Sequence, residues 1–163
     1  MAGLLQRTRL ALDNCKEHLS SLPSQNPDVE NYLTQHILVL LCAEVQQAIY
    51  STLDDRTKIT GDAEVQSFAS FAGRRVVRGV EKTELAGFIG MFGEEKKNQF
   101  ATLLAEEDVT IYGNAVSSRH KIAHNTQGAN ITFRELEKAV DAACKMINAA
   151  REALGLNRID PAQ

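Results

Sequence analysis

Apolar residues recur along this chain at the spacing of helices rather than in the strict alternation of a half-buried strand. In the segment Gly3–Leu22, leucines and one cysteine return after three, four or seven residues and so share one face of a helix. Pro23 ends that pattern. Asn26 and Pro27 then provide a capping side chain followed by proline at the first helical position, and the helix that they start can continue to about Leu53.

The middle of this second helix is apolar on every side across Ile37–Leu41, which predicts a buried central helix. Two short helices are expected further on, one starting at Thr83 and one covering Glu94–Leu104. Before them, Thr60-Gly61-Asp62 should begin a third helix, and the Phe68/Phe71 pair is expected in the core. The predicted inner face of that helix consists of Val65, Phe68, Ala69, Ala72 and Val76.

Two long amphipathic segments follow. The first covers about Glu107–Ala123, and residues 125–130 after it have the composition of a loop. Thr132, with Glu135 three residues later, forms a capping box that begins the last helix. The predicted fold is therefore all-α: a helical bundle of about four long helices plus short helices, with a single domain over residues 1–156 and a short tail over residues 157–163. The expected buried stripe of the last helix is Leu136, Val140, Ala143, Ile147 and Leu154.

Composition narrows the function classes. The 163 residues are 44% hydrophobic and 24% charged, which is typical of one globular domain. A net charge of −3 argues against binding nucleic acid through bulk charge, but it permits a local basic cleft. The three cysteines are far apart, which favours free thiols over disulfides. With no signal peptide and no apolar run near the roughly 20 residues that span a bilayer, a cytoplasmic protein without membrane contact is expected.

The residues best suited to chemistry form the run Arg119-His120-Lys121-Ile122-Ala123-His124. Arg119 and His124 lie about 140° apart around an ideal helix, so they converge only if the helix ends near Ala123 or if a second subunit contributes. An imidazole can take the proton of a ribose 2′-hydroxyl, and a guanidinium can hold the charge that builds on phosphate oxygens. The pair could therefore cleave a phosphodiester without a metal. The alternative is a helix-end pair that only caps its own helix.

This run resembles the signature of the HEPN superfamily, in which arginine is followed by a polar residue, a short variable stretch and histidine. Arg119, His120 and His124 occupy these positions, and the predicted order of helices is also similar. Among HEPN branches the chain looks most similar to RiboL-PSP-type proteins. The resemblance implies a homodimeric, metal-independent and cofactor-free endoribonuclease, in which two motif copies form one composite cleft.

By this resemblance, His124 would be the general base or acid of this chain, Arg119 would stabilise the phosphate, and His120 would be a supporting polar residue. The expected products carry a 2′,3′-cyclic phosphate and a 5′-hydroxyl. Such proteins commonly act as toxins or in defence against phage, so an antitoxin or another regulatory protein is a possible partner. Thr126 replaces the tyrosine that is modified in one toxin branch, and Asn125 replaces a common glycine, where it can serve as the helix stop.

Other residues leave alternatives open. Arg74, Arg75 and Arg78 share a side if they are on one helix, and with Lys121 they could bind RNA backbone, although a solvated face is equally compatible. His120 and the histidine four residues later could face one metal, but no third ligand is evident, so no metal site is expected. The alternative function is a catalytically inactive HEPN-like module that binds RNA, nucleotide or a partner protein.

Overall fold

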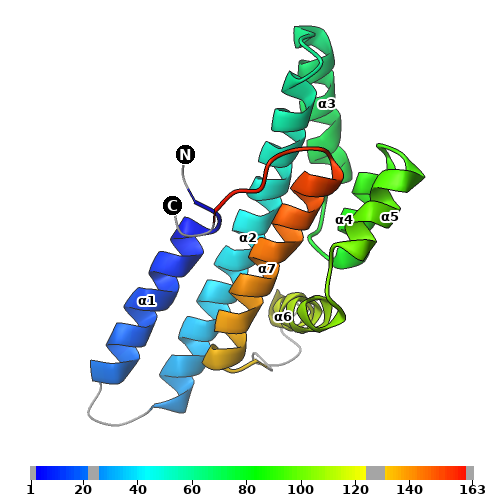
Figure 1. Ribbon diagram of the computed structural model, residues 1–163. Coiled ribbons are helices and arrows are strands. Elements are labelled where there is room, and N and C mark those ends of the chain that lie inside the picture. Colours follow the sequence, from blue (N-terminus) through cyan, green and yellow to red (C-terminus); the bar gives the residue numbers. More distant parts are fainter. Residues whose placement is uncertain (1–2, 22–25, 124–130, 161–163) are drawn as a thin grey trace.

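The computed structural model describes residues 3–21, 26–123 and 131–160, and it contains seven α-helices and no strand in these ranges. The predicted all-α fold is confirmed. The helices pack around a single apolar core (Figure 1). Their bounds are α1 (Gln6–Ser21), α2 (Pro27–Lys58), α3 (Ala63–Val76), α4 (Lys82–Gly90), α5 (Glu94–Thr102), α6 (Glu106–Ala123) and α7 (Phe133–Ala153).

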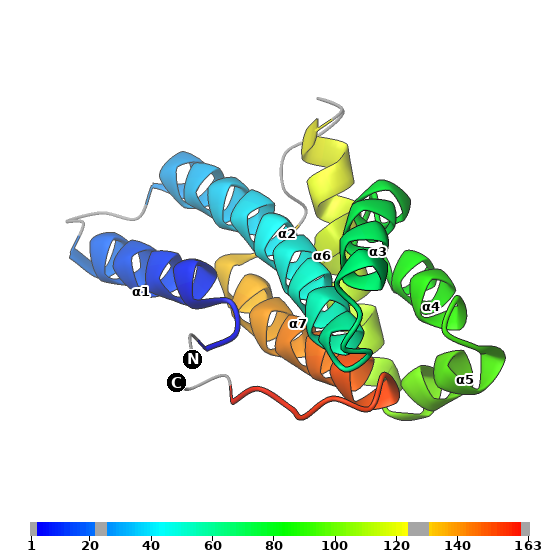
Figure 2. The same cartoon turned by 90° about the horizontal axis from the view of Figure 1, so that it is seen from above.

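The two longest helices, α2 and α7, lie side by side at the centre of the molecule, with α1 on one side and α6 on the other (Figures 1 and 2). The predicted stripe of α7 is confirmed, since all five of its residues are at most 1% exposed. Alanines flank that stripe and are buried too, which lets neighbouring helices approach α7 closely. The short helices α4 and α5 pack on each other and on α7.

The start of α2 forms as predicted, because the Asn26 side chain accepts hydrogen bonds from the backbone N–H groups of Asp28 and Val29. Among the described helices, α2 alone is long and apolar enough to cross a membrane by length and composition. Its residues Ile37, Leu38 and Leu41 are fully buried, as in the core helix of a globular protein. The prediction that Ile37–Leu41 is buried on every side is wrong at Val39, which is 48% exposed.

The predicted inner face of α3 is wrong at its large residues, although Ala69 and Ala72 are half-buried. Phe68 is 73% exposed and Phe71 is 60% exposed, and Val65 and Val76 are exposed as well. The helix instead packs on α2 through Gly73, where a Cβ atom would collide with the side chain of Leu53. Such a close approach requires small residues on the inner side, so the large apolar residues face solvent.

The last two long helices lie where the sequence predicts them. The helix α6 extends from Glu106 to Ala123, within one residue of the prediction. At the start of α7, Glu135 accepts a hydrogen bond from Thr132 N at 2.8 Å, and Glu135 N donates to Thr132 Oγ1 at 3.2 Å, which confirms the capping box. The cysteines are free thiols as predicted, with Cys42 and Cys144 buried and Cys15 half-buried.

Candidate functional site

The first half of α6 is fixed against the segment between α3 and α4. Tyr112, only 1% exposed, donates a 2.7 Å hydrogen bond from its hydroxyl to the carbonyl oxygen of Val80. Nearer its start, α6 is tied to α7 by the ion pair between Asp108 and Lys145, at 2.7 Å. These contacts determine where the end of α6, with Arg119 and His120, meets the rest of the protein.

The segment 77–80 is held as firmly on its other side. The carbonyl oxygen of Val77 accepts hydrogen bonds from the Tyr50 hydroxyl at 3.0 Å and from Gln46 Nε2 at 3.2 Å. Val77 and Val80 are both buried, whereas Arg78 between them is exposed. Two buried anchors therefore present the Arg78 side chain at a defined place on the surface.

A pocket of about 210 Å³ lies where α2, the segment 77–80, α4 and α6 meet. Arg119 and His120 line it from α6, and Arg78 lines it from the segment 77–80. The structure thus brings together three of the residues singled out in the sequence. Further lining residues are Cys42 and Gln46 from α2 and Glu84 from α4.

Arg119 is partly buried in this pocket. In the part of the chain that the structure describes, its guanidinium has no hydrogen bond or ion pair to a protein group. Burial raises the pKa of the nearby Cys42 thiol to about 11, while the positive charge of Arg119 acts in the opposite direction. The thiol is therefore uncharged near neutral pH and does not offset the arginine. The Arg119 guanidinium is therefore available to bind an anion that enters the pocket.

Two acidic side chains lie at the pocket: Glu84 lines it, and Glu81 contacts His120, which also lines it. The backbone N–H of Glu81 donates a hydrogen bond to the Glu84 carboxylate at 3.2 Å, at the start of α4. The carboxylate of Glu81 in turn lies 3.5 Å from Nε2 of His120, which is about half exposed. This contact positions the His120 imidazole, which lines the pocket.

The remaining two residues of the predicted catalytic set, His124 and Asn125, lie outside the described residues. The helix α6 reaches Ala123, the residue directly before His124. The convergence of Arg119 and His124 and the helix stop at Asn125 therefore stay predictions.

The residues of the basic run do not all lie on one helix. The helix α3 ends at Val76, so the prediction that Arg74, Arg75 and Arg78 share a helical side is wrong. Arg74 lies over the Tyr50 ring at 5.0 Å and 3.7 Å from the Asp54 carboxylate, and Arg75 lies over the Phe71 ring at 4.4 Å. Only Arg78, beyond the end of the helix, lines the pocket of Arg119. No local pattern in the sequence connects these two arginines.

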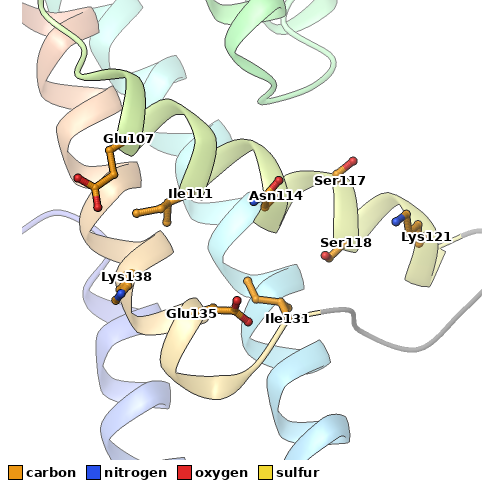
Figure 3. Close-up of a pocket in the computed structure, with 9 residues that line it drawn as sticks. All are labelled: Glu107, Ile111, Asn114, Ser117, Ser118, Lys121, Ile131, Glu135 and Lys138. Carbon is orange, nitrogen blue, oxygen red and sulfur yellow. The ribbon is translucent and has the colours of Figure 1, made fainter.

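Lys121 also lies apart from Arg119. It lines a second hollow, of about 410 Å³, between α6 and the start of α7. Figure 3 shows Lys121 with Asn114 and Ser118 along α6, and Glu135 and Lys138 on α7. At 100° per residue, Asn114 and Lys121 lie about 140° and 160° around the helix from Arg119, and Ser118 lies about 100° away.

Among the described residues, no three His, Cys, Asp or Glu side chains are grouped to hold a metal ion. The geometry defines an all-α protein with a cationic pocket near the end of its penultimate long helix. The family model for RiboL-PSP-HEPN matches residues 4–155, and the chain therefore belongs to the RiboL-PSP-HEPN family. No curated protein sequence and no solved structure matched the chain significantly.

Proposed function

We propose that this protein is a metal-independent endoribonuclease whose pocket holds the scissile phosphate between Arg119 and Arg78. The observation that supports this proposal best is the Arg119 guanidinium, which is partly buried without an anionic partner among the described residues. Two guanidinium groups that line one pocket suit the charge that builds on phosphorus oxygens during cleavage. Membership of the HEPN family supports the same chemistry.

In the proposed reaction, His124 removes the proton of the ribose 2′-hydroxyl, and the 2′-oxygen attacks the adjacent phosphorus. The bond to the 5′-oxygen breaks, and that oxygen takes a proton from a second acid. The products are a 2′,3′-cyclic phosphate and a 5′-hydroxyl. In a homodimer with a composite cleft, His124 of the partner subunit is the second acid. His120, oriented by Glu81, and Asn125 support this site.

Further parts of the proposal rest on the sequence and on family membership. Arg74, Arg75 and Lys121 would contact RNA backbone outside the pocket. The protein would act in the cytoplasm as a toxin or a phage-defence effector, and an antitoxin or other regulatory protein would control it.

A second candidate function is a HEPN module that binds RNA, nucleotide or a partner protein without cleaving it. The observation that favours it is the Glu84 carboxylate, which lines the same pocket as Arg119. A negative charge at that place weakens the binding of phosphate relative to a purely cationic pocket.

One experiment separates the two candidates. Purified protein is incubated with a mixed RNA substrate in EDTA, and the variants Arg119→Ala and His124→Ala are compared with Arg7→Ala, an exposed arginine on α1. Cleavage in EDTA that both pocket variants lose, and that Arg7→Ala keeps, supports the ribonuclease. Intact RNA with retained binding supports the module. Activity that EDTA abolishes contradicts the proposed mechanism.

A further inference from the structure

The outer face of α3 carries an exposed stripe of four residues, which we call the α3 stripe: Glu64, Phe68, Phe71 and Arg75. Their spacing of four, three and four residues is that of the contact seam of a coiled coil. All four are exposed, and the two rings are among the most exposed large apolar side chains of the described residues. In Figure 1, α3 stands beside α2 at one end of the molecule, where α2 covers only its inner side. A surface helix that contacts only its own chain normally places its apolar residues toward the core and its polar residues toward solvent.

The stripe is symmetric about its own midpoint, between Ala69 and Ser70. Inverting the helix about that point exchanges Phe68 with Phe71, and it exchanges Glu64 with Arg75. Aromatic residues thus fall on aromatic residues, and a negative charge falls on a positive one. A stripe with this order is complementary to an inverted copy of itself in both polarity and charge.

We propose that α3 pairs antiparallel with α3 of a second copy of this chain. Phe68 then packs on Phe71 of the partner subunit, and Glu64 faces Arg75 of the partner subunit. A two-fold axis makes each contact twice, which is the arrangement of an isologous dimer. Antiparallel pairing also sets the two helix dipoles head to tail.

A contact within the chain already positions one charged residue of the α3 stripe for this pairing. The Arg75 guanidinium lies 4.4 Å from the centroid of the Phe71 ring, so its charge is already held along the seam. The exposed Val65 and Val76 flank the stripe and widen the apolar area that the partner covers. A contact between two helices of 14 residues is small, so we expect a concentration-dependent equilibrium rather than a permanent dimer.

The α3 contact differs from the composite cleft proposed above. In the antiparallel pair, the two copies of Val76, the last residue of α3, are about 13 helical positions apart, or roughly 20 Å along the axis, and Arg78 lies beyond each of these ends. The pairing therefore keeps the two Arg119 pockets apart, and a composite cleft would need another contact. The proposal does not depend on ribonuclease activity.

The first test measures mass by light scattering and sedimentation equilibrium over a range of concentrations. The mass of the wild-type protein should rise above the monomer mass of 17.9 kDa as the concentration increases, and Phe68→Glu/Phe71→Glu should have a lower mass than wild type at the same concentration. Both rings are exposed, so the helical circular dichroism spectrum should not change. A wild-type protein that stays monomeric, or a mass that the double substitution leaves unchanged, would overturn the proposal.

The second test concerns the antiparallel register. Glu64→Arg and Arg75→Glu should each raise the dissociation constant on the order of tenfold, since each change acts twice in a symmetric dimer. Combining them should restore the wild-type value. A combined variant no better than the single ones would overturn the register.

RNA is the other occupant to test on the same variants. If the phenylalanine substitutions weaken RNA binding and leave the mass unchanged, the stripe binds bases and self-association through it is wrong. RNA cleavage and mass are measured in parallel on Arg119→Ala, which changes the pocket and leaves the α3 stripe intact, so a failure of one proposal is distinguishable from a failure of the other.

Discussion

The hydroxyl of Tyr112 and the carbonyl oxygen of Val80 form a 2.7 Å hydrogen bond between two buried residues that are 32 positions apart. The bond joins α6, which carries Arg119, to the segment that carries Arg78. Burial raises the pKa of the Tyr112 phenol well above its usual value, so the hydroxyl keeps its proton and acts as the donor. This contact sets the relative positions of the two arginines in the pocket.

We expect Tyr112→Phe to lower the free energy of unfolding by about 1–3 kcal/mol, because the buried carbonyl of Val80 then lacks a partner. Urea unfolding followed by circular dichroism measures this change. The matched control is Tyr32→Phe, whose ring is 71% exposed and which should leave stability nearly unchanged. Equal effects of the two substitutions would contradict a structural role for the Tyr112 bond.

A second prediction compares two glycines in helices. Gly73 packs where a Cβ would meet the Leu53 side chain, which is itself 4% exposed, whereas Gly113 is exposed with open space at its Cβ. Gly113→Ala should stabilise the protein by about 0.5–1 kcal/mol through helix propensity. Gly73→Ala should be less stable than Gly113→Ala by about 1–3 kcal/mol, because α3 must move away from α2.

Thermal and urea unfolding of both alanine variants measure that difference. Adding Leu53→Ala to Gly73→Ala makes room for the new methyl group, so the two changes should cost less together than the sum of each alone. Strict additivity would show that Gly73 and Leu53 do not compete for the same space.

Local signals in the sequence were sufficient for most of the helices. The Asn26 cap and the Thr132 capping box were predictable because each involves residues within three positions of one another. The stripe of α7 was predictable because a long helix with a strong apolar period has one stable orientation against a core. These features need no knowledge of distant contacts.

The orientation of α3 and the membership of the pocket were not predictable in this way. The side of α3 that faces inward depends on how closely Gly73 approaches Leu53, which is a tertiary contact. Arg78 joins Arg119 only because Tyr50 and Tyr112 bind the segment between α3 and α4 from two sides. Neither relationship corresponds to a periodic pattern or a motif in the sequence.

A third prediction concerns pH. Hydrogen bonds from the backbone and side chain of Thr132 lower the pKa of Glu135 from its ordinary value of 4.5. Because the pKa of Glu135 is lower in the folded protein, its ionised carboxylate stabilises the fold above about pH 4.5. This stabilisation is lost as the pH falls through the pKa that Glu135 has in the folded protein. Glu135→Gln should therefore reduce stability at pH 7, and the difference from wild type should shrink in that acid range. A difference that is constant from pH 7 to pH 3 would contradict this assignment.

The fourth prediction tests whether Arg78 belongs to the Arg119 site. Arg78→Ala should lower the rate of RNA cleavage at least about tenfold, since a fixed cation at a developing phosphate charge contributes several kcal/mol. Arg74→Ala is the comparison variant, with protein in saturating excess over RNA: Arg74 is held by Asp54 and the Tyr50 ring outside the pocket, so its contact with RNA backbone affects RNA binding and not the chemical step. It should change the rate by no more than about twofold, as expected for an exposed ion pair.

Single-turnover cleavage in EDTA measures both rates. Arg78→Lys should keep part of the activity, because it keeps the charge but not the planar donor geometry. Equal losses in the Arg74 and Arg78 variants would mean that the basic run acts as a diffuse RNA-attracting surface, and that the pocket holds its phosphate through Arg119 without help from Arg78.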